Sequence, residues 1–180
     1  MVPVGAAVLV LAGCGYADPY QANGPVASVE QTTPTPVPGA DTFDEGANLK
    51  LVTFPDGVKY ANIKKGNGAR ATTGSTITAQ YTLFLQSTHA KIDSSRDPGR
   101  TPLTGVIDPI NGSFIPGFVE GVTGMQVGGK RRIIVPASRG YGSDPNNLPP
   151  GIPAGATLVF IVELQGVSAT PSPSPSATPS

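Results

Sequence analysis

The stretch 139-RGYGSDPNNLPPGIPAGATLVFIVEL-164 joins a loop of turn-forming residues to one of the most apolar segments of the chain. Four prolines, at positions 145, 149, 150 and 153, lie in the loop among glycines and asparagines. Proline fixes φ, so these residues lower the conformational entropy that the loop loses on folding. From Thr157 to Val167, β-branched and aromatic residues predict a buried strand. We therefore expect a stiffened loop that leads into a core strand.

Similar strand patterns occur earlier in the chain. Two alternating segments flank the turn signal Pro55-Asp56-Gly57 and predict a hairpin. Pro136 ends a later strand, because proline cannot donate a ladder hydrogen bond. The segments that predict strands before the last one are LKLVTF (49–54), VKYANIK (58–64), TITAQYTLFLQ (76–86), AKIDSS (90–95) and KRRIIVP (130–136).

One short amphipathic helix is predicted directly after Pro116-Gly117. Its apolar residues recur at helical spacing and are Phe118, Val119, Val122 and Met125. Together with the strands, this pattern predicts an α+β fold: an antiparallel sheet of about five strands wrapped around one short helix.

The composition excludes several kinds of function. The chain has 180 residues, and its 12 basic and 12 acidic residues cancel, which argues against nucleic acid as a main partner. Lys130-Arg131-Arg132 is a short basic cluster that we interpret as a strand with a solvated side. A single cysteine and a single histidine, His89, permit neither an intrachain disulfide nor a Cys/His metal site. We expect no cofactor, and His89 is expected to be an exposed loop residue.

The two ends of the chain differ from its middle. Residues 2–12 are apolar but too few to span a bilayer, and Leu11-Ala12-Gly13-Cys14 resembles a bacterial lipobox. Residues 1–14 are thus expected to be a signal peptide, with lipidated Cys14 as the anchor of an exported protein in the membrane, although no Lys or Arg precedes the apolar run. The alternative is a small buried cysteine near a disordered N-terminus.

Between these ends we expect one globular domain with disordered flanks. Residues 15–47 predict a disordered Pro/Thr linker, and residues 169–180 predict a disordered Ser/Thr/Pro tail. The domain is expected over residues 48–168. Nothing in the sequence indicates more than a monomer.

Within residues 48–168, five motifs follow one another in an order typical of one family. They are KIDSS (91–95), FIPGFVEG (114–121), MQVGGKR (125–131), Tyr141-Gly142, and Ile152-Pro153 leading into ATLVF (156–160). In this order they resemble the FKBP-type peptidyl-prolyl cis-trans isomerases, in their bacterial lipoprotein form. The resemblance implies a half-barrel of antiparallel strands around one helix, with the proline of a polypeptide substrate in an apolar pocket between them.

The resemblance also implies roles for individual residues. The backbone N–H of Ile115 and the hydroxyl of Tyr141 would hold substrate carbonyls. Asp93 would lie at the pocket edge and accept a hydrogen bond from Tyr81 or another neighbour. The substrate-binding walls would be Tyr81, Ile92, Phe114, Phe118, Ile152 and Phe160. Without the ordered match, Tyr81, Phe118 and Phe160 would be read as core residues and Asp93 as a turn residue.

Three positions depart from the family pattern. Ile92 and Leu103 stand where aromatic residues are usual, and Phe118 stands where tryptophan is common. Macrolide-type inhibitors are candidate ligands, with binding weakened by these departures. Two functions are open: a prolyl isomerase that assists the folding of exported proteins, and an FKBP-like binding or chaperone module with little or no isomerase activity.

Overall fold

The computed structural model describes residues 41–110 and 112–168. The predicted signal peptide and lipobox, most of the predicted linker and all of the predicted tail lie outside these residues. Among the residues described, no helix is both long enough and apolar enough to cross a membrane.

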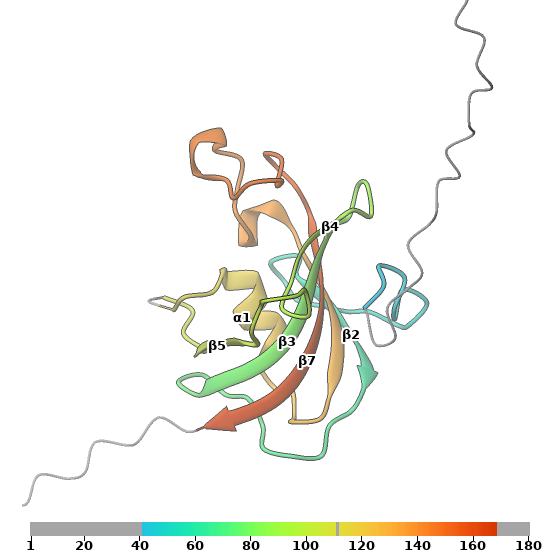
Figure 1. The fold of residues 1–180 in the computed structure, drawn as a ribbon, viewed down its shortest axis with the longest axis vertical. Coiled ribbons are helices and arrows are strands. Elements are labelled where there is room, and N and C mark those ends of the chain that lie inside the picture. Colours follow the sequence, from blue (N-terminus) through green and yellow to red (C-terminus); the bar gives the residue numbers. More distant parts are fainter. Residues whose placement is uncertain (1–40, 111, 169–180) are drawn as a thin grey trace, which may run out of the picture. The chain divides into compact units, whose positions relative to one another are not determined.

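The described residues form an antiparallel sheet of seven strands with one α-helix (Figure 1). The elements are β1 (Val52–Thr53), β2 (Lys59–Lys64), β3 (Thr76–Leu85), β4 (Lys91–Ser94), β5 (Leu103–Val106), α1 (Pro116–Val122), β6 (Lys130–Val135) and β7 (Leu158–Ser168). Short 3-10 helices follow β6 at Ala137–Arg139 and Pro145–Asn147. The α+β class with one helix is confirmed, but the expected number of about five strands was too low.

The sheet order is β1-β2-β6-β7-β3-β4, and β5 also pairs with β3. The long strand β3 therefore pairs with three other strands. On one edge, Thr76–Ala79 pairs with β5 and Thr82–Phe84 pairs with β4, and the other edge pairs with β7. β5 was missed because its four residues, LTGV, include a glycine and are too few to show an alternating pattern.

Both faces of β7 are buried, which explains its unbroken apolar sequence. Leu158, Phe160 and Val162 face the main core, together with the buried residues of α1. Val159 and Ile161 face the opposite side, where they form a second cluster with Phe84. A strand covered on both faces has no need of alternating polar residues.

The second cluster is covered by residues that the sequence assigned to the linker. Phe43 packs against it and lies edge-on to Phe84, with ring centroids 6.0 Å apart. Asp41 is 8% exposed; its carboxylate lies 2.7 Å from Lys130 Nζ and accepts a 2.7 Å hydrogen bond from Thr82 Oγ1. The predicted domain boundary at residue 48 was therefore wrong: the described fold begins by Asp41. His89 is exposed, as expected, and its ring stacks on Phe43.

The basic cluster on β6 is buried, contrary to the expected solvated side. Arg131 is 6% exposed and Arg132 is 3% exposed. β6 lies between β2 and β7, so neighbouring strands shield both edges. Arg132 lies over the Phe43 ring and donates to the Phe43 carbonyl, and Arg131 lies over the Tyr60 ring. Aromatic faces and backbone carbonyls thus take the place of water around these cations.

The helix α1 lies close to the sheet because two of its residues are glycines. A Cβ atom at Gly117 would clash with Val135, and one at Gly121 would clash with Ile133, both on β6. Pro116 occupies the first turn, where the missing N–H costs no hydrogen bond. This close approach fixes the helix against β6, and the N-terminal end of the helix borders the cavity described next.

Candidate functional site

A cavity of about 190 Å³ opens between the N-terminal end of α1 and the sheet. Side chains from four strands, the helix and two loops converge on it. They are Tyr81, Leu83, Asp93, Leu103, Ser113, Phe114, Ile115, Phe118, Tyr141 and Phe160.

The floor of the cavity is a cluster of three phenylalanines. Phe118 lies between Phe114 and Phe160, with ring centroids 5.3 Å from each. The rings are tilted at 59° and 66°, an edge-to-face arrangement that aromatic pairs favour. A Cβ atom at Gly105 of β5 would lie 2.5 Å from the Phe114 ring, so this glycine makes room for the phenylalanine. The result is a continuous aromatic surface at the floor of the cavity.

One edge of the cavity is polar and is built around the Asp93 carboxylate. Tyr81 donates its hydroxyl to Asp93 Oδ2, and Arg100 donates a guanidinium N–H to Asp93 Oδ1. Burial raises the pKa of Asp93, but the hydrogen bond from Tyr81 and the charge of Arg100 outweigh it, so the pKa lies below its ordinary value. Burial and the Asp93 carboxylate raise the pKa of Tyr81. Asp93 is therefore ionised at neutral pH, and Tyr81 keeps its proton.

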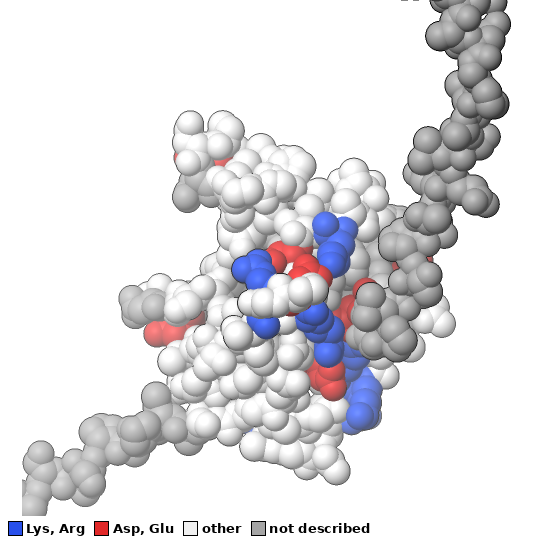
Figure 2. Space-filling model, in the orientation of Figure 1, with Lys and Arg blue, Asp and Glu red and all other residues white. Residues whose placement is uncertain are grey.

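Basic and acidic side chains are interleaved around β4 and the loop that follows it, as Figure 2 shows. Lys91 Nζ lies 2.6 Å from Asp97 Oδ1, and Arg100 pairs with Asp93. The charges at this rim of the cavity are therefore paired, and neither positive nor negative charge is in excess there.

Two half-buried hydrogen-bond donors at the cavity are free to meet a ligand. Tyr141 is half-buried just after the first 3-10 helix, and its hydroxyl bonds to none of the described residues. Burial and the nearby Asp93 carboxylate raise its pKa, so the hydroxyl remains a donor. The Ile115 carbonyl accepts from Phe118 and Val119 in the first helical turn, whereas its N–H has no partner in the described part of the chain. Both groups can donate to carbonyls of a bound peptide.

The structure brings seven of the nine predicted site residues to the cavity and leaves two outside its lining. Ile152 is 7% exposed and belongs to the main core. Ile92 lies at an irregularity in the pairing of β3 with β4 and packs beside Gly151, while its neighbour Asp93 reaches the cavity. The predicted wall role of Ile92 and Ile152 therefore stays a prediction, with both residues beside the cavity lining rather than in it. Ile152 buries part of the proline-rich loop in the core.

Three further residues line the cavity. Leu83 follows Tyr81 by two positions on β3, and strand periodicity could have identified it because such residues share a face. Leu103, to which the sequence assigned no role, lies on β5. Ser113 belongs to the loop before α1 and carries no sequence signal.

The family model of the FKBP-type peptidyl-prolyl cis-trans isomerases matches residues 68–165, more than half of the chain. The chain belongs to this family. The matched residues include the whole cavity lining described above. The resemblance inferred from the order of the motifs is thereby confirmed.

Relatives in bacteria and eukaryotes are similar over the same domain. The FK506-binding protein of Neisseria meningitidis serogroup B is 40% identical over 108 residues, which cover 60% of this chain and 94% of the relative. A probable FK506-binding protein of Corynebacterium glutamicum is 36% identical over 64% of this chain and 92% of its own length. FK506-binding protein 4 of Dictyostelium discoideum is 40% identical, but the match spans only 29% of that longer protein.

Solved structures agree on the fold. The FkpA crystal structure from Escherichia coli superposes with a TM-score of 0.60 at 30% identity, over 70% of this chain and 55% of that one. AtFKBP13 superposes with a TM-score of 0.57 at 28% identity, over 66% of this chain and 99% of that one. The half-barrel around one helix is thus an architecture shared with these proteins.

Proposed function

We propose that this domain catalyses cis–trans isomerisation of X–Pro bonds in exported polypeptides, by non-covalent binding of the proline in the 190 Å³ cavity. The observation that carries the proposal is the Phe114–Phe118–Phe160 floor, flanked by the unpartnered donors of Tyr141 and Ile115. The family match supports the same reaction.

The reaction needs no nucleophile. Rotation about the peptide bond is opposed by amide resonance, which sets a barrier of ~18–20 kcal/mol. The twisted transition state loses this resonance, so its carbonyl is less charge-separated than that of the planar amide. A dry apolar cavity destabilises the planar form relative to the twisted one, and each ~1.4 kcal/mol of difference changes the rate tenfold. Phe118, 2% exposed, supplies such a surface.

The polar groups have positioning roles in this proposal. Donors at Tyr141 and Ile115 hold the carbonyls beside the proline, so that the chain on one side of the bond is fixed while the other side rotates. Asp93 accepts from Tyr81 and Arg100 at once, one through each carboxylate oxygen. Because its pKa is lowered, Asp93 acts as a fixed acceptor that orients Tyr81, and no proton transfer is assigned to it.

The cellular setting and ligands are part of the same proposal. Leu11-Ala12-Gly13-Cys14 supports an exported, lipid-anchored protein that is held at the membrane by Cys14, and we propose that it acts as a monomer. Proline isomerisation is among the slow steps of folding, and such an enzyme would speed it for exported chains. Macrolide-type inhibitors are proposed to occupy the same cavity.

The test compares two buried phenylalanines, one in the cavity and one outside it. In the full chain, Phe118→Leu should abolish most of the acceleration of X–Pro exchange in a short peptide. Phe84→Leu, in the cluster on the other face of the sheet, should cost stability while leaving the acceleration. No acceleration by the unmodified chain at micromolar concentration would exclude the enzyme. Peptide binding without acceleration would favour the binding or chaperone module, for which the non-aromatic wall at Leu103 is the supporting observation.

A further inference from the structure

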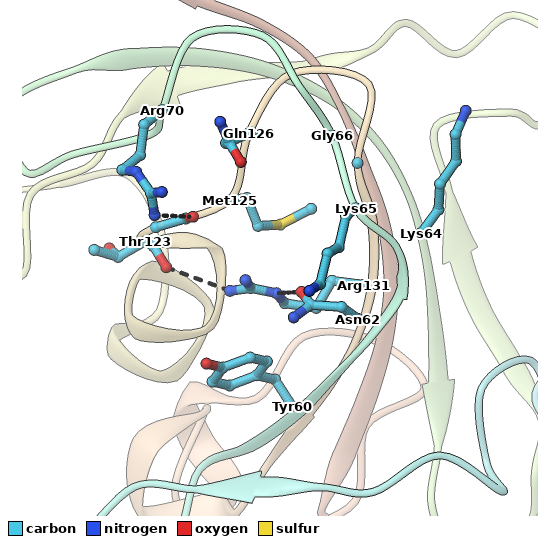
Figure 3. A pocket seen from close by; sticks show the side chains of 12 residues that line it. Tyr60, Asn62, Lys64, Lys65, Gly66, Arg70, Thr123, Met125, Gln126 and Arg131 are labelled. Carbon is cyan, nitrogen blue, oxygen red and sulfur yellow. Dashed lines mark hydrogen bonds between the residues drawn. The ribbon is translucent and has the colours of Figure 1, made fainter.

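A second cavity, of about 360 Å³, lies at the opposite end of α1 from the prolyl pocket. Thr123 and Gly124, which follow the helix, form one side, and the end of β2 with the loop after it forms the other (Figure 3). Its lining contains four cationic residues, Lys64, Lys65, Arg70 and Arg131, and no acidic residue.

Arg131 lies at the base of this cavity and is more than nine-tenths buried. Its Nε donates to Asn62 Oδ1 at 2.9 Å, and its Nη1 donates to the carbonyls of Gly121 at 2.6 Å and Thr123 at 3.3 Å. These bonds cap the C-terminal end of the helix, a structural role that accounts for Nε and Nη1. The two N–H groups of Nη2 bond to none of the described residues.

The positive charge of Arg131 has no counter-ion in the described structure. No ion pair there joins Lys65, Arg70 or Arg131 to a carboxylate, although other cations of the domain are paired. Burial, together with repulsion from Arg70, lowers the pKa of Arg131. The Tyr60 ring and the three oxygen acceptors of Arg131 are uncharged, so they leave its buried charge unneutralised, and an anion that enters the cavity would gain more from it than from an exposed arginine.

The rim residues converge on the same space. Figure 3 shows the Lys65 side chain pointing toward Arg131 and Asn62, whereas the Lys64 side chain points away. Arg70 lies across the cavity and is held there by a 3.0 Å hydrogen bond from its Nη1 to the Gly124 carbonyl. Three cations therefore face one cavity, two from the loop after β2 and one from β6.

We propose that this cavity binds a phosphate group, with Arg131 at the base and Lys65 and Arg70 at the rim. The two N–H groups of Arg131 Nη2 can donate charge-assisted hydrogen bonds to phosphate oxygens, and a doubly charged group balances three cations better than a single carboxylate does. The phosphate belongs either to a soluble compound or to a lipid headgroup. This site is separate from the prolyl pocket and does not depend on the isomerase activity.

The test is a titration of the full chain with inorganic phosphate, followed by the amide signals in NMR spectra. Phosphate replaces chloride during the titration so that the ionic strength stays constant. We expect saturable shifts at Lys65, Thr123 and Gly124. The double substitution Lys65→Gln/Arg70→Gln affects only exposed side chains and should weaken binding by about a hundredfold, roughly tenfold for each charge-assisted bond. Lys59→Gln removes the same charge from an exposed position on β2 outside the cavity and should leave the affinity unchanged.

Vesicles distinguish the two sources of phosphate. Binding to phosphatidylcholine vesicles that contain phosphatidic acid, reduced both by inorganic phosphate and by the double substitution, would identify a lipid headgroup. Phosphate binding without such a reduction would identify a soluble phosphate compound. An absence of saturable shifts, or equal affinities for the unmodified chain, Lys59→Gln and the double variant, would overturn the proposal.

Discussion

The hydroxyl of Tyr81 donates a hydrogen bond to the Asp93 carboxylate, and Arg100 contacts the other oxygen of that carboxylate. Both oxygens of Asp93 are therefore engaged at the edge of the prolyl cavity. The pair ties β3 to β4 at the point where both strands reach the cavity, and the hydroxyl of Tyr141 remains available to a substrate.

Acid should lower the stability of the fold because it protonates the Asp93 carboxylate. A carboxyl whose pKa is lowered by folding stabilises the protein above its ordinary pKa of 3.8, and this contribution is lost as pH falls through the lower pKa of the folded state. Between pH 5 and pH 2, the urea midpoint of the unmodified chain should fall more steeply than that of Asp93→Asn. Arg100→Gln removes a group that lowers the pKa of Asp93, so its acid-induced loss of stability should be smaller and should end at a higher pH. Parallel acid profiles for all three proteins would contradict this assignment.

Tyr141→Phe tests the proposed donor while keeping the aromatic ring. The substitution removes only a hydroxyl that bonds to none of the described residues, so thermal stability should change little. If the hydroxyl holds a substrate carbonyl, kcat/KM for X–Pro exchange should fall by up to about tenfold, the value of one neutral hydrogen bond. A loss of stability with unchanged kcat/KM would place Tyr141 in a structural role.

Much of the fold and the cavity could be predicted from local patterns. The continuous apolar run of β7 predicted a buried strand, and the ordered motifs placed Phe118, Tyr141 and Asp93 at one cavity. The parts that were missed depend on contacts far apart in sequence. Asp41 belongs to the domain because Lys130 and Arg96 meet its carboxylate, which no local pattern around residue 41 reveals.

Contacts between residues far apart in the sequence also explain why Arg131 and Arg132 were wrongly expected to be solvated. Three consecutive charged residues on a strand predict exposure, since isolated charges are rarely buried. Here aromatic rings of Tyr60 and Phe43 and backbone carbonyls surround the two guanidinium groups. Phe43 lies 89 positions from Arg132, and Tyr60 also precedes Arg131 by a long stretch of chain, so these rings become neighbours of the guanidinium groups only in the folded chain.

Gly121→Ala tests the close approach of α1 to β6. The added Cβ atom would clash with Ile133, so the substitution should lower the free energy of unfolding by about 1–3 kcal/mol. Gly166→Ala on β7 is the matched control, because a Cβ atom there has Thr78 at 3.7 Å, an ordinary contact. Urea unfolding measures both. Equal stabilities would mean that the helix can move away from the sheet without cost.

Asp41→Ala should destabilise the domain strongly although residue 41 lies outside the domain predicted from sequence. The substitution leaves Lys130, which is largely buried, without one of its two carboxylate partners, and it removes the acceptor of the Thr82 hydroxyl. Breaking a buried pair in this way costs about 3 kcal/mol or more. Asp44→Ala, an exposed aspartate in the same turn, should change the free energy of unfolding by less than about 0.5 kcal/mol. If the two variants unfold at the same urea concentration, residues 41–47 do not contribute to the folded domain.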